Sequence, residues 1–224
     1  MKRFALYILF FGVSQSSFAQ KETLKALEFS INPGINYRWI SLKNNELSWL
    51  KDSQDNLQKP SAGIGIQINH EFGITEKRSF FAGIAYSRQG YEYKKNSLEG
   101  FRTYTLHHHF LQVPLGINAY FRLNERLQFA VQPSLLTGVL ISTSAKYVYE
   151  GDQLIRKMET YPQPLLISIQ AQLAAGISVR IDQRWKFRTN IYFQQQLTAM
   201  NKGDLKVRLY NTGIQLGLSR YLGN

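Results

Sequence analysis

One run of the sequence could bind a metal or transfer a proton: three consecutive histidines, His107, His108 and His109. Imidazole titrates near neutral pH and is a common metal ligand. In an extended segment His107 and His109 share one face and His108 points to the other. Two imidazoles still need further ligands to complete a metal site, and catalysis needs a nucleophile and an orienting group beside the histidine.

The residues around the histidines show no spacing that would complete either kind of site. The hydroxyls and acids nearest to them in the predicted sheet are Ser97, Thr103, Thr143, Ser144, Glu150 and Asp152. We therefore predict that His107–His109 pack at the rim of the fold. We expect no catalytic residue, no cofactor-binding residue and no metal ligand, and hence no enzyme and no cofactor.

The histidines precede one of eight segments in which apolar and polar residues alternate with a period of two. Such alternation is typical of strands with one apolar face. The segments are 29–39, 64–74, 80–93, 110–123, 127–141, 167–181, 185–197 and 205–222. The last one changes phase: Val207 and Leu209 are out of step with Ile214 and Leu216, which indicates either a bulge near 209–211 or a membrane part that starts only at Tyr210.

The connections between these segments alternate in length. The odd ones, 41–60, 94–102, 149–164 and 198–204, are longer than the even ones, 75–79, 124–125 and 182–183. Antiparallel strands joined in order place all odd connections at one end of a barrel. Short periplasmic turns and longer outer loops are typical of a transmembrane barrel. The pattern predicts an all-β fold, an eight-stranded antiparallel up-and-down transmembrane β-barrel.

The residue composition of the polar face distinguishes a lipocalin-like soluble carrier from an outer-membrane barrel. It is built mainly of Gln, Asn, Ser, Gly and Ala, which suits the narrow lumen of an eight-stranded barrel better than bulk water. We expect its basic residues Arg38, Arg122, Arg180 and Arg188 to pair with Glu71 and with amides. Aromatic residues near the strand ends predict interfacial girdles: Tyr37, Trp39, Phe72, Tyr91, Tyr93, Phe121, Phe129, Trp185 and Phe187.

The first 19 residues predict a secretory signal peptide. Lys2 and Arg3 form a basic start, an apolar run covers 4–13, and Ser17 to Ala19 form a small-residue cleavage site. Residues 20–224 then form a single barrel domain in the outer membrane. The chain has no cysteine and a net charge of +12. In an exported protein, this charge indicates binding to lipid phosphate or to acidic glycans. The sequence has no dense Lys/Arg block of the kind that binds nucleic acid.

Two short motifs resemble those of the PorT-like outer-membrane β-barrels of Bacteroidetes-type bacteria. They are a Y-S-x-x-G stretch and an aromatic-L-x-V-P-L stretch, formed here by Tyr86, Ser87 and Gly90, and by Phe110, Leu111, Val113, Pro114 and Leu115. These motifs are structural and name no active site, and the resemblance permits a link to protein secretion across the outer membrane.

Three functions remain open from the sequence. The first is a non-enzymatic interaction or assembly component of the outer membrane. Its expected partners are outer-membrane lipid and lipopolysaccharide, together with other envelope or secretion proteins. The second is an outer-membrane enzyme acting on lipid A or phospholipid, supported only by the histidine run. The third is a soluble carrier with an apolar lumen.

Overall fold

The structure is a computed structural model that describes residues 25–42, 58–75, 77–97, 100–149, 157–161, 166–200 and 205–222. The predicted signal peptide lies outside these residues. The long strands are β1 (Lys25–Leu42), β3 (Ser61–Thr75), β4 (Arg78–Ser97), β5 (Gly100–Arg122), β6 (Leu127–Tyr149), β8 (Leu166–Arg180), β9 (Trp185–Gln196) and β10 (Leu205–Tyr221). Two short strands, β2 (Gln58–Lys59) and β7 (Lys157–Tyr161), pair with β4 and β6.

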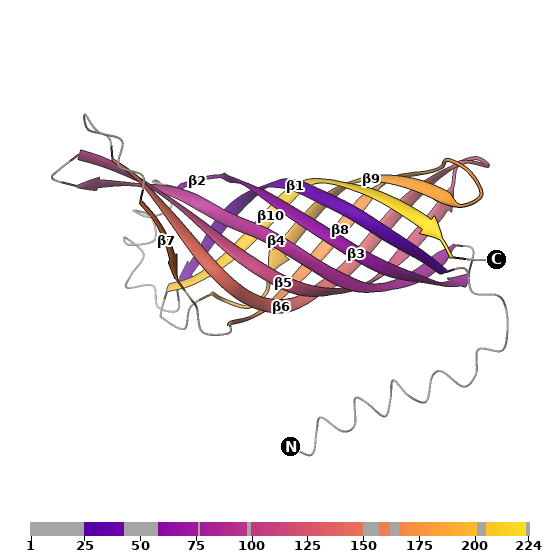
Figure 1. The fold of residues 1–224 in the computed structure, drawn as a ribbon, viewed down its shortest axis with the longest axis horizontal. Helices are drawn as coiled ribbons and strands as arrows, with labels where there is room; N and C mark the ends of the chain where they lie inside the picture. The colour runs from indigo at the N-terminus through magenta and orange to yellow at the C-terminus, as the bar shows by residue number, and fades with distance from the viewer. Residues whose placement is uncertain are drawn as a thin grey trace, which may run out of the picture.

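The eight long strands close into one ring, as Figure 1 shows. Each pairs antiparallel with its neighbours along the chain, and β1 pairs with β10 from Ala26↔Tyr221 to Leu42↔Leu205. Closure satisfies the backbone groups that an open sheet would leave unpaired at its edges. The predicted eight-stranded antiparallel up-and-down barrel is confirmed. In the described residues, no helix is long and apolar enough to cross a membrane.

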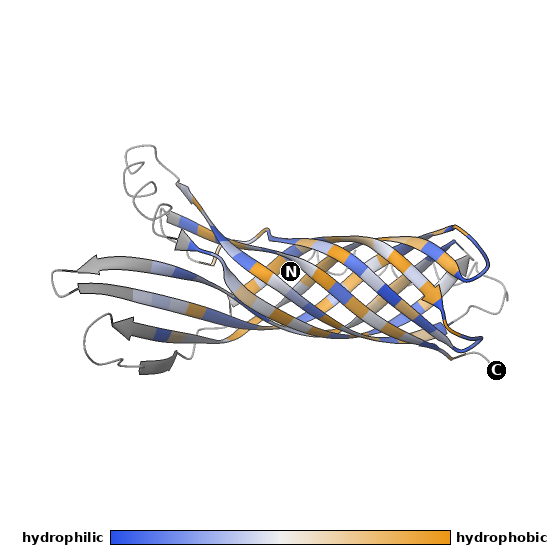
Figure 2. Cartoon of the chain, turned by 90° about the horizontal axis from the view of Figure 1, so that it is seen from above, coloured by the Kyte–Doolittle hydropathy of each residue, from blue (hydrophilic) through white to orange (hydrophobic). Residues whose placement is uncertain are grey.

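The barrel is apolar outside and polar inside. β9 shows this most regularly, because its residues alternate strictly between exposed and buried from Trp185 to Gln196. Ile191 on the outer face is 72% exposed, whereas Arg188 on the inner face is 1% exposed. Figure 2 shows the same alternation of hydropathy along the other strands. A soluble carrier would have the opposite arrangement, so the lipocalin-like alternative is wrong.

The aromatic residues near the strand ends lie on the outer face at both ends of the barrel, with two exceptions. Trp39 lies at one end, and Phe72, Phe121, Phe129, Trp185 and Phe187 lie toward the end with the short turns; all are exposed. Tyr91, however, is buried, and the guanidinium carbon of Arg38 lies 4.5 Å from the centroid of its ring. The prediction that Tyr91 and Tyr93 join the girdle was wrong, because both share the inward parity of Ser87 and Gln89.

β10 keeps one register against β1 from Leu205 to Tyr221 and one register against β9 from Tyr210 to Arg220. The predicted bulge near 209–211 is therefore absent from these pairings. Leu209 faces inward at 1% exposure and packs with Tyr91, Phe110 and Leu140 in a small apolar cluster. The change of phase in the sequence marks the place where the lumen itself becomes apolar.

The outer connections are more strand-like than predicted. Residues 94–102 were expected to form a loop, but β4 runs to Ser97 and β5 starts at Gly100. β6 likewise continues to Tyr149. Figure 1 shows β4, β5 and β6 reaching beyond the ring at the end opposite the short turns. The predicted short turns are confirmed: β5 and β6 are separated by 123–126, and β8 and β9 by 181–184.

Candidate functional site

Four ionisable side chains meet inside the barrel, toward the end with the short turns. Glu28 comes from β1, Glu71 from β3, and Lys186 and Arg188 from β9. Lys186 and Arg188 are two residues apart on one strand, so both face the lumen. All four are buried, with exposures between 1% and 6%. The set carries two negative and two positive charges and is therefore neutral as a whole.

Arg188 connects the two carboxylates. Its Nη2 forms an ion pair with Glu28 and lies 3.9 Å from Glu71 Oε2. Its Nη1 donates a hydrogen bond of 2.8 Å to Asn118 Oδ1 on β5, across the lumen. The Ser219 hydroxyl donates to Glu28 at 2.9 Å. Charge-assisted hydrogen bonds of this kind offset the cost of removing the ions from water.

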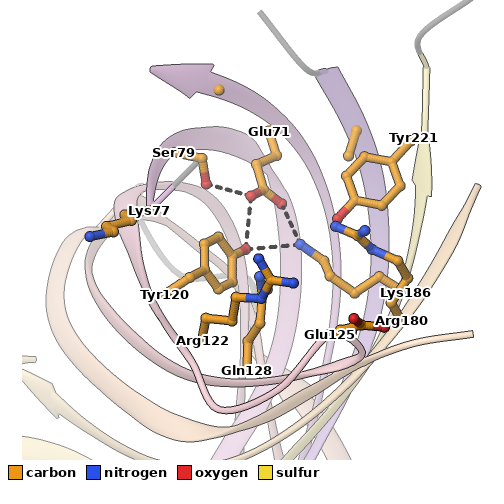
Figure 3. A pocket seen from close by; sticks show the side chains of 12 residues that line it. Glu71, Lys77, Ser79, Tyr120, Arg122, Glu125, Gln128, Arg180, Lys186 and Tyr221 are labelled. Carbon is orange, nitrogen blue, oxygen red and sulfur yellow. Dashed lines mark hydrogen bonds and ion pairs between the residues drawn. The ribbon is translucent and has the colours of Figure 1, made fainter. Parts of the chain in front are cut away.

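Glu71 is the centre of the second half of the network, drawn in Figure 3. Lys186 Nζ lies 3.5 Å from Glu71 Oε2 and donates a hydrogen bond of 3.0 Å to the Tyr120 hydroxyl. The Tyr120 hydroxyl in turn donates to Glu71 Oε1 at 2.8 Å, and the Ser79 hydroxyl donates to the same oxygen. A carboxylate engaged by three partners is suited to fixing strands in place rather than to proton transfer.

These contacts correct part of the predicted network. Arg188 forms an ion pair with Glu71 and bonds the amide of Asn118 as predicted, and it also forms an ion pair with Glu28, which was not predicted. Arg38 stacks on Tyr91 at the opposite end of the lumen. Arg122 and Arg180 are exposed at the short-turn end. Sequence reasoning placed Lys186 on the inward face with Arg188 but missed its ion pair with Glu71. It also missed Glu28, which parity could have found because Glu28 shares a face with Ser30.

A cavity of about 430 Å³ adjoins this network at the short-turn end. Its floor is formed by Glu71, Ser79, Tyr120 and Lys186, as Figure 3 shows. The remaining charged residues around it come from the ends of strands and from turns: Lys77, Arg122, Glu125 and Arg180. The lining therefore holds four cations against two carboxylates.

Farther from the short turns, amide side chains fill the lumen. Gln89 of β4 donates a hydrogen bond of 3.0 Å to Gln170 of β8, which is not its neighbour in the sheet. Gln170 donates to Ser168 at 3.0 Å, and Asn190 donates to Gln215 at 3.0 Å. Side-chain hydrogen bonds thus connect strands on facing sides of the lumen.

The three histidines divide between the faces as their parity predicts. His108 points inward, is 8% exposed, and its Nδ1 lies 2.9 Å from Thr143 Oγ1. His109 lies outward, with Nδ1 2.6 Å from the Tyr86 hydroxyl and Nε2 3.4 Å from Ser144 Oγ. His107 pairs across the sheet with Ser144.

The hydroxyls and acids considered with the histidines are only partly brought together. Ser144 and Thr143 contact histidines, whereas Glu150 and Asp152 lie outside the described residues and the side chain of Ser97 is not described. The partner that orients His109 is a phenol rather than a carboxylate. In the described part of the chain, no group of three or more His, Cys, Asp or Glu side chains is arranged to hold a metal ion.

Several solved structures are similar to this chain at low identity. Neisserial surface protein A (NspA) is 12% identical, with 88% of this chain and 96% of that chain covered and a TM-score of 0.41. Ail, the attachment invasion locus protein of Yersinia pestis, is 14% identical, with 85% of this chain and 97% of that chain covered and a TM-score of 0.34. The outer membrane protease OmpT from Escherichia coli is 10% identical, with 91% of this chain and 99% of that chain covered and a TM-score of 0.47.

No curated protein matches the chain. A family model does match, over residues 18–199, and its description is "outer membrane protein beta-barrel domain". The match covers most of the chain and agrees with the apolar exterior, the closed ring and the aromatic residues at both ends of the outer face. The chain belongs to the family of outer-membrane proteins with this β-barrel domain, and its location is the outer membrane.

Proposed function

We propose that the protein is a non-enzymatic component of the outer membrane that works by binding other envelope proteins. The observation that carries the proposal is the combination of a filled lumen with strands that continue beyond the ring. The filled lumen leaves the ends of the barrel as the surfaces available for function.

The lumen is unsuited to passing solutes, because side chains from facing walls bond to one another. Arg188 of β9 reaches Asn118 of β5, and Gln89 of β4 reaches Gln170 of β8. Barrels of eight strands are just wide enough for their side chains to fill them, whereas open channels have about 16 strands or more. We expect the purified protein in planar bilayers to show no stable conductance steps.

The strands that continue beyond the ring are much longer than a membrane requires. β4 has 20 residues, and β5 and β6 have 23 each, whereas a membrane strand needs about 9–11. Their outer parts form a sheet whose edges are covered in part by β2 and β7. In the described residues, β4 from Lys94 and β6 from Val148 have no further strand on their outer side. Such edges can pair with a strand of another protein. On this basis we assign partner binding to the outer parts of β4, β5 and β6.

The closer relationship to PorT-like barrels belongs to the same proposal. It is supported by the motifs at Tyr86–Gly90 and Phe110–Leu115 and by the family shown above. A role linked to protein secretion, with lipopolysaccharide around the apolar band, follows from that relationship.

Shortening the outer hairpin tests the partner-binding proposal. A variant in which 94–102 are replaced by a two-residue turn should insert normally but lose its crosslinked partners in native membranes. A matched variant with two residues added to the 181–184 turn should keep them. Identical crosslinking patterns for both variants and the wild type would refute the assignment to the outer strands.

The histidines test the non-enzymatic part of the proposal. Replacing His107, His108 and His109 together by Gln keeps polar side chains at these positions and removes most proton transfer and metal affinity. We expect this variant to restore any phenotype of a deletion strain. Mass spectra of lipid A and phospholipids should also match among wild-type, deletion and variant strains. If deletion altered the acyl chains and the folded variant could not reverse it, the enzyme acting on lipid A or phospholipid would be the correct alternative.

A further inference from the structure

The cavity at the short-turn end carries more positive charge than its own carboxylates balance. Lys77, Arg122, Arg180 and Lys186 line it together with Glu71 and Glu125, which leaves a net charge of +2. Glu71 and Lys186 already neutralise each other within the buried network. The excess therefore lies at the open side of the cavity, with the residues of the turns and strand ends.

Two guanidinium groups at this open side have free donors. Arg122 uses its Nε to donate a hydrogen bond of 3.3 Å to Asn124 O. Within the described residues, no hydrogen bond or ion pair engages the terminal nitrogens of Arg122 or the guanidinium nitrogens of Arg180. Arg122 and Arg180 come from β5 and β8 and line one cavity. The planar fork of a guanidinium matches the oxygens of a phosphate group and can bind two of them at once.

The cavity is large enough for a small molecule and not only for an ion. Its volume of about 430 Å³ falls within the range of small-molecule sites, about 300–1,000 Å³. The aromatic rings of Tyr120 and Tyr221 also line it and offer apolar surface beside the charges. The Tyr120 hydroxyl is occupied by Glu71 and Lys186, so the floor is already bonded and the free donors lie at the entrance.

We propose that this cavity binds a phosphate group that enters from the periplasmic side, held by Arg122 and Arg180. The short turns mark this end as periplasmic. The negative charge of a phosphate group complements the excess positive charge of the lining. The group can belong to a phospholipid headgroup of the inner leaflet or to a soluble molecule about the size of a sugar phosphate. The cavity binds this group whether or not the outer strands bind a partner.

Equilibrium dialysis with radiolabelled glycerol 3-phosphate tests the site. The full-length folded protein is held in maltoside micelles, which contain no phosphate. We expect saturable binding to the wild type. The double variant Arg122→Gln with Arg180→Gln should bind at least tenfold more weakly, because it loses two bidentate donors at the phosphate.

A matched control separates the cavity from general attraction by a basic protein. Arg126 and Arg184 lie in the two turns that directly follow Arg122 and Arg180, and both are exposed, but they do not line the cavity. The double variant Arg126→Gln with Arg184→Gln has the same change of net charge, and its dissociation constant should stay within about twofold of the wild-type value. Equal weakening in both double variants, or no saturable binding to the wild type, would overturn the proposal. The heat-modifiable gel shift of each variant confirms that it is folded.

Adding lipid to the micelles identifies the source of the phosphate. If phosphatidylglycerol abolishes the binding of glycerol 3-phosphate and oleate at the same molar ratio does not, the natural ligand is a lipid headgroup. If binding persists with both lipids, the ligand is a soluble phosphorylated molecule. Oleate supplies negative charge without phosphate, so it controls for repulsion by the micelle surface.

Discussion

Arg188→Met should lower the free energy of unfolding by about 3–5 kcal/mol, the usual cost of removing one partner of a buried ion pair. Arg188 is 1% exposed and is the ion-pair partner of Glu28, which is equally buried. The thioether keeps much of the stem volume, so the loss reports the charge that remains unpaired on Glu28 rather than an empty space.

Urea unfolding of protein refolded into lipid vesicles measures this loss, with tryptophan fluorescence as the signal. Adding Glu28→Gln to Arg188→Met removes the unpaired charge and should recover at least half of the lost free energy. Arg220→Ala is the surface control, because Arg220 is exposed and its guanidinium lies over the Trp185 ring, at 5.8 Å, outside the buried network. If the double variant were no more stable than Arg188→Met, the charge on Glu28 would not be the cause.

Leu173→Arg should cost about 2–4 kcal/mol, the range for a basic residue on the lipid face at the bilayer midplane. Leu173 is 55% exposed and lies near the middle of β8, where it pairs with Phe193 of β9 and with Pro133 of β6. Its outward position and the apolar residues on either side along the strand place it deep in the band that contacts lipid.

A second arginine on the same face of the same strand provides the control. Ile181, directly after β8, is 58% exposed at the periplasmic rim, where water is close. Ile181→Arg should cost only about 0–1 kcal/mol. The same unfolding assay compares the two variants. Equal costs at both positions would mean that β8 does not cross the apolar layer as the barrel requires.

The alternation of apolar and polar residues predicts almost the whole fold, because it indicates which side of the sheet each residue faces. β9 is the clearest example: its inward residues Lys186, Arg188 and Asn190 follow from parity alone. Parity would also have placed Tyr91 inside, had its aromatic character not suggested an interfacial girdle. The outer strands were missed because 94–102 are mostly polar and their two large apolar residues, Leu98 and Phe101, do not alternate with a period of two.

The contacts inside the lumen could not be predicted in the same way. Parity says that Glu28 and Arg188 both point inward, but they are 160 positions apart in the chain. Whether they meet depends on the tilt of the strands and on the stagger of all the pairings between β1 and β9. Those quantities come from the closed ring, so the sequence predicted a luminal network but not which acid pairs with which base.

The pairing of the first and last strands has a consequence for biogenesis. Ala26 bonds beside Tyr221 and Leu42 beside Leu205, so the ring cannot close until nearly the whole polypeptide has been synthesised and exported. Until then β1 exposes an edge able to pair with other chains. Contacts between such distant positions also form slowly, which prolongs this exposure. During transit across the periplasm the amino-terminal strand therefore stays unpaired until its carboxy-terminal partner arrives.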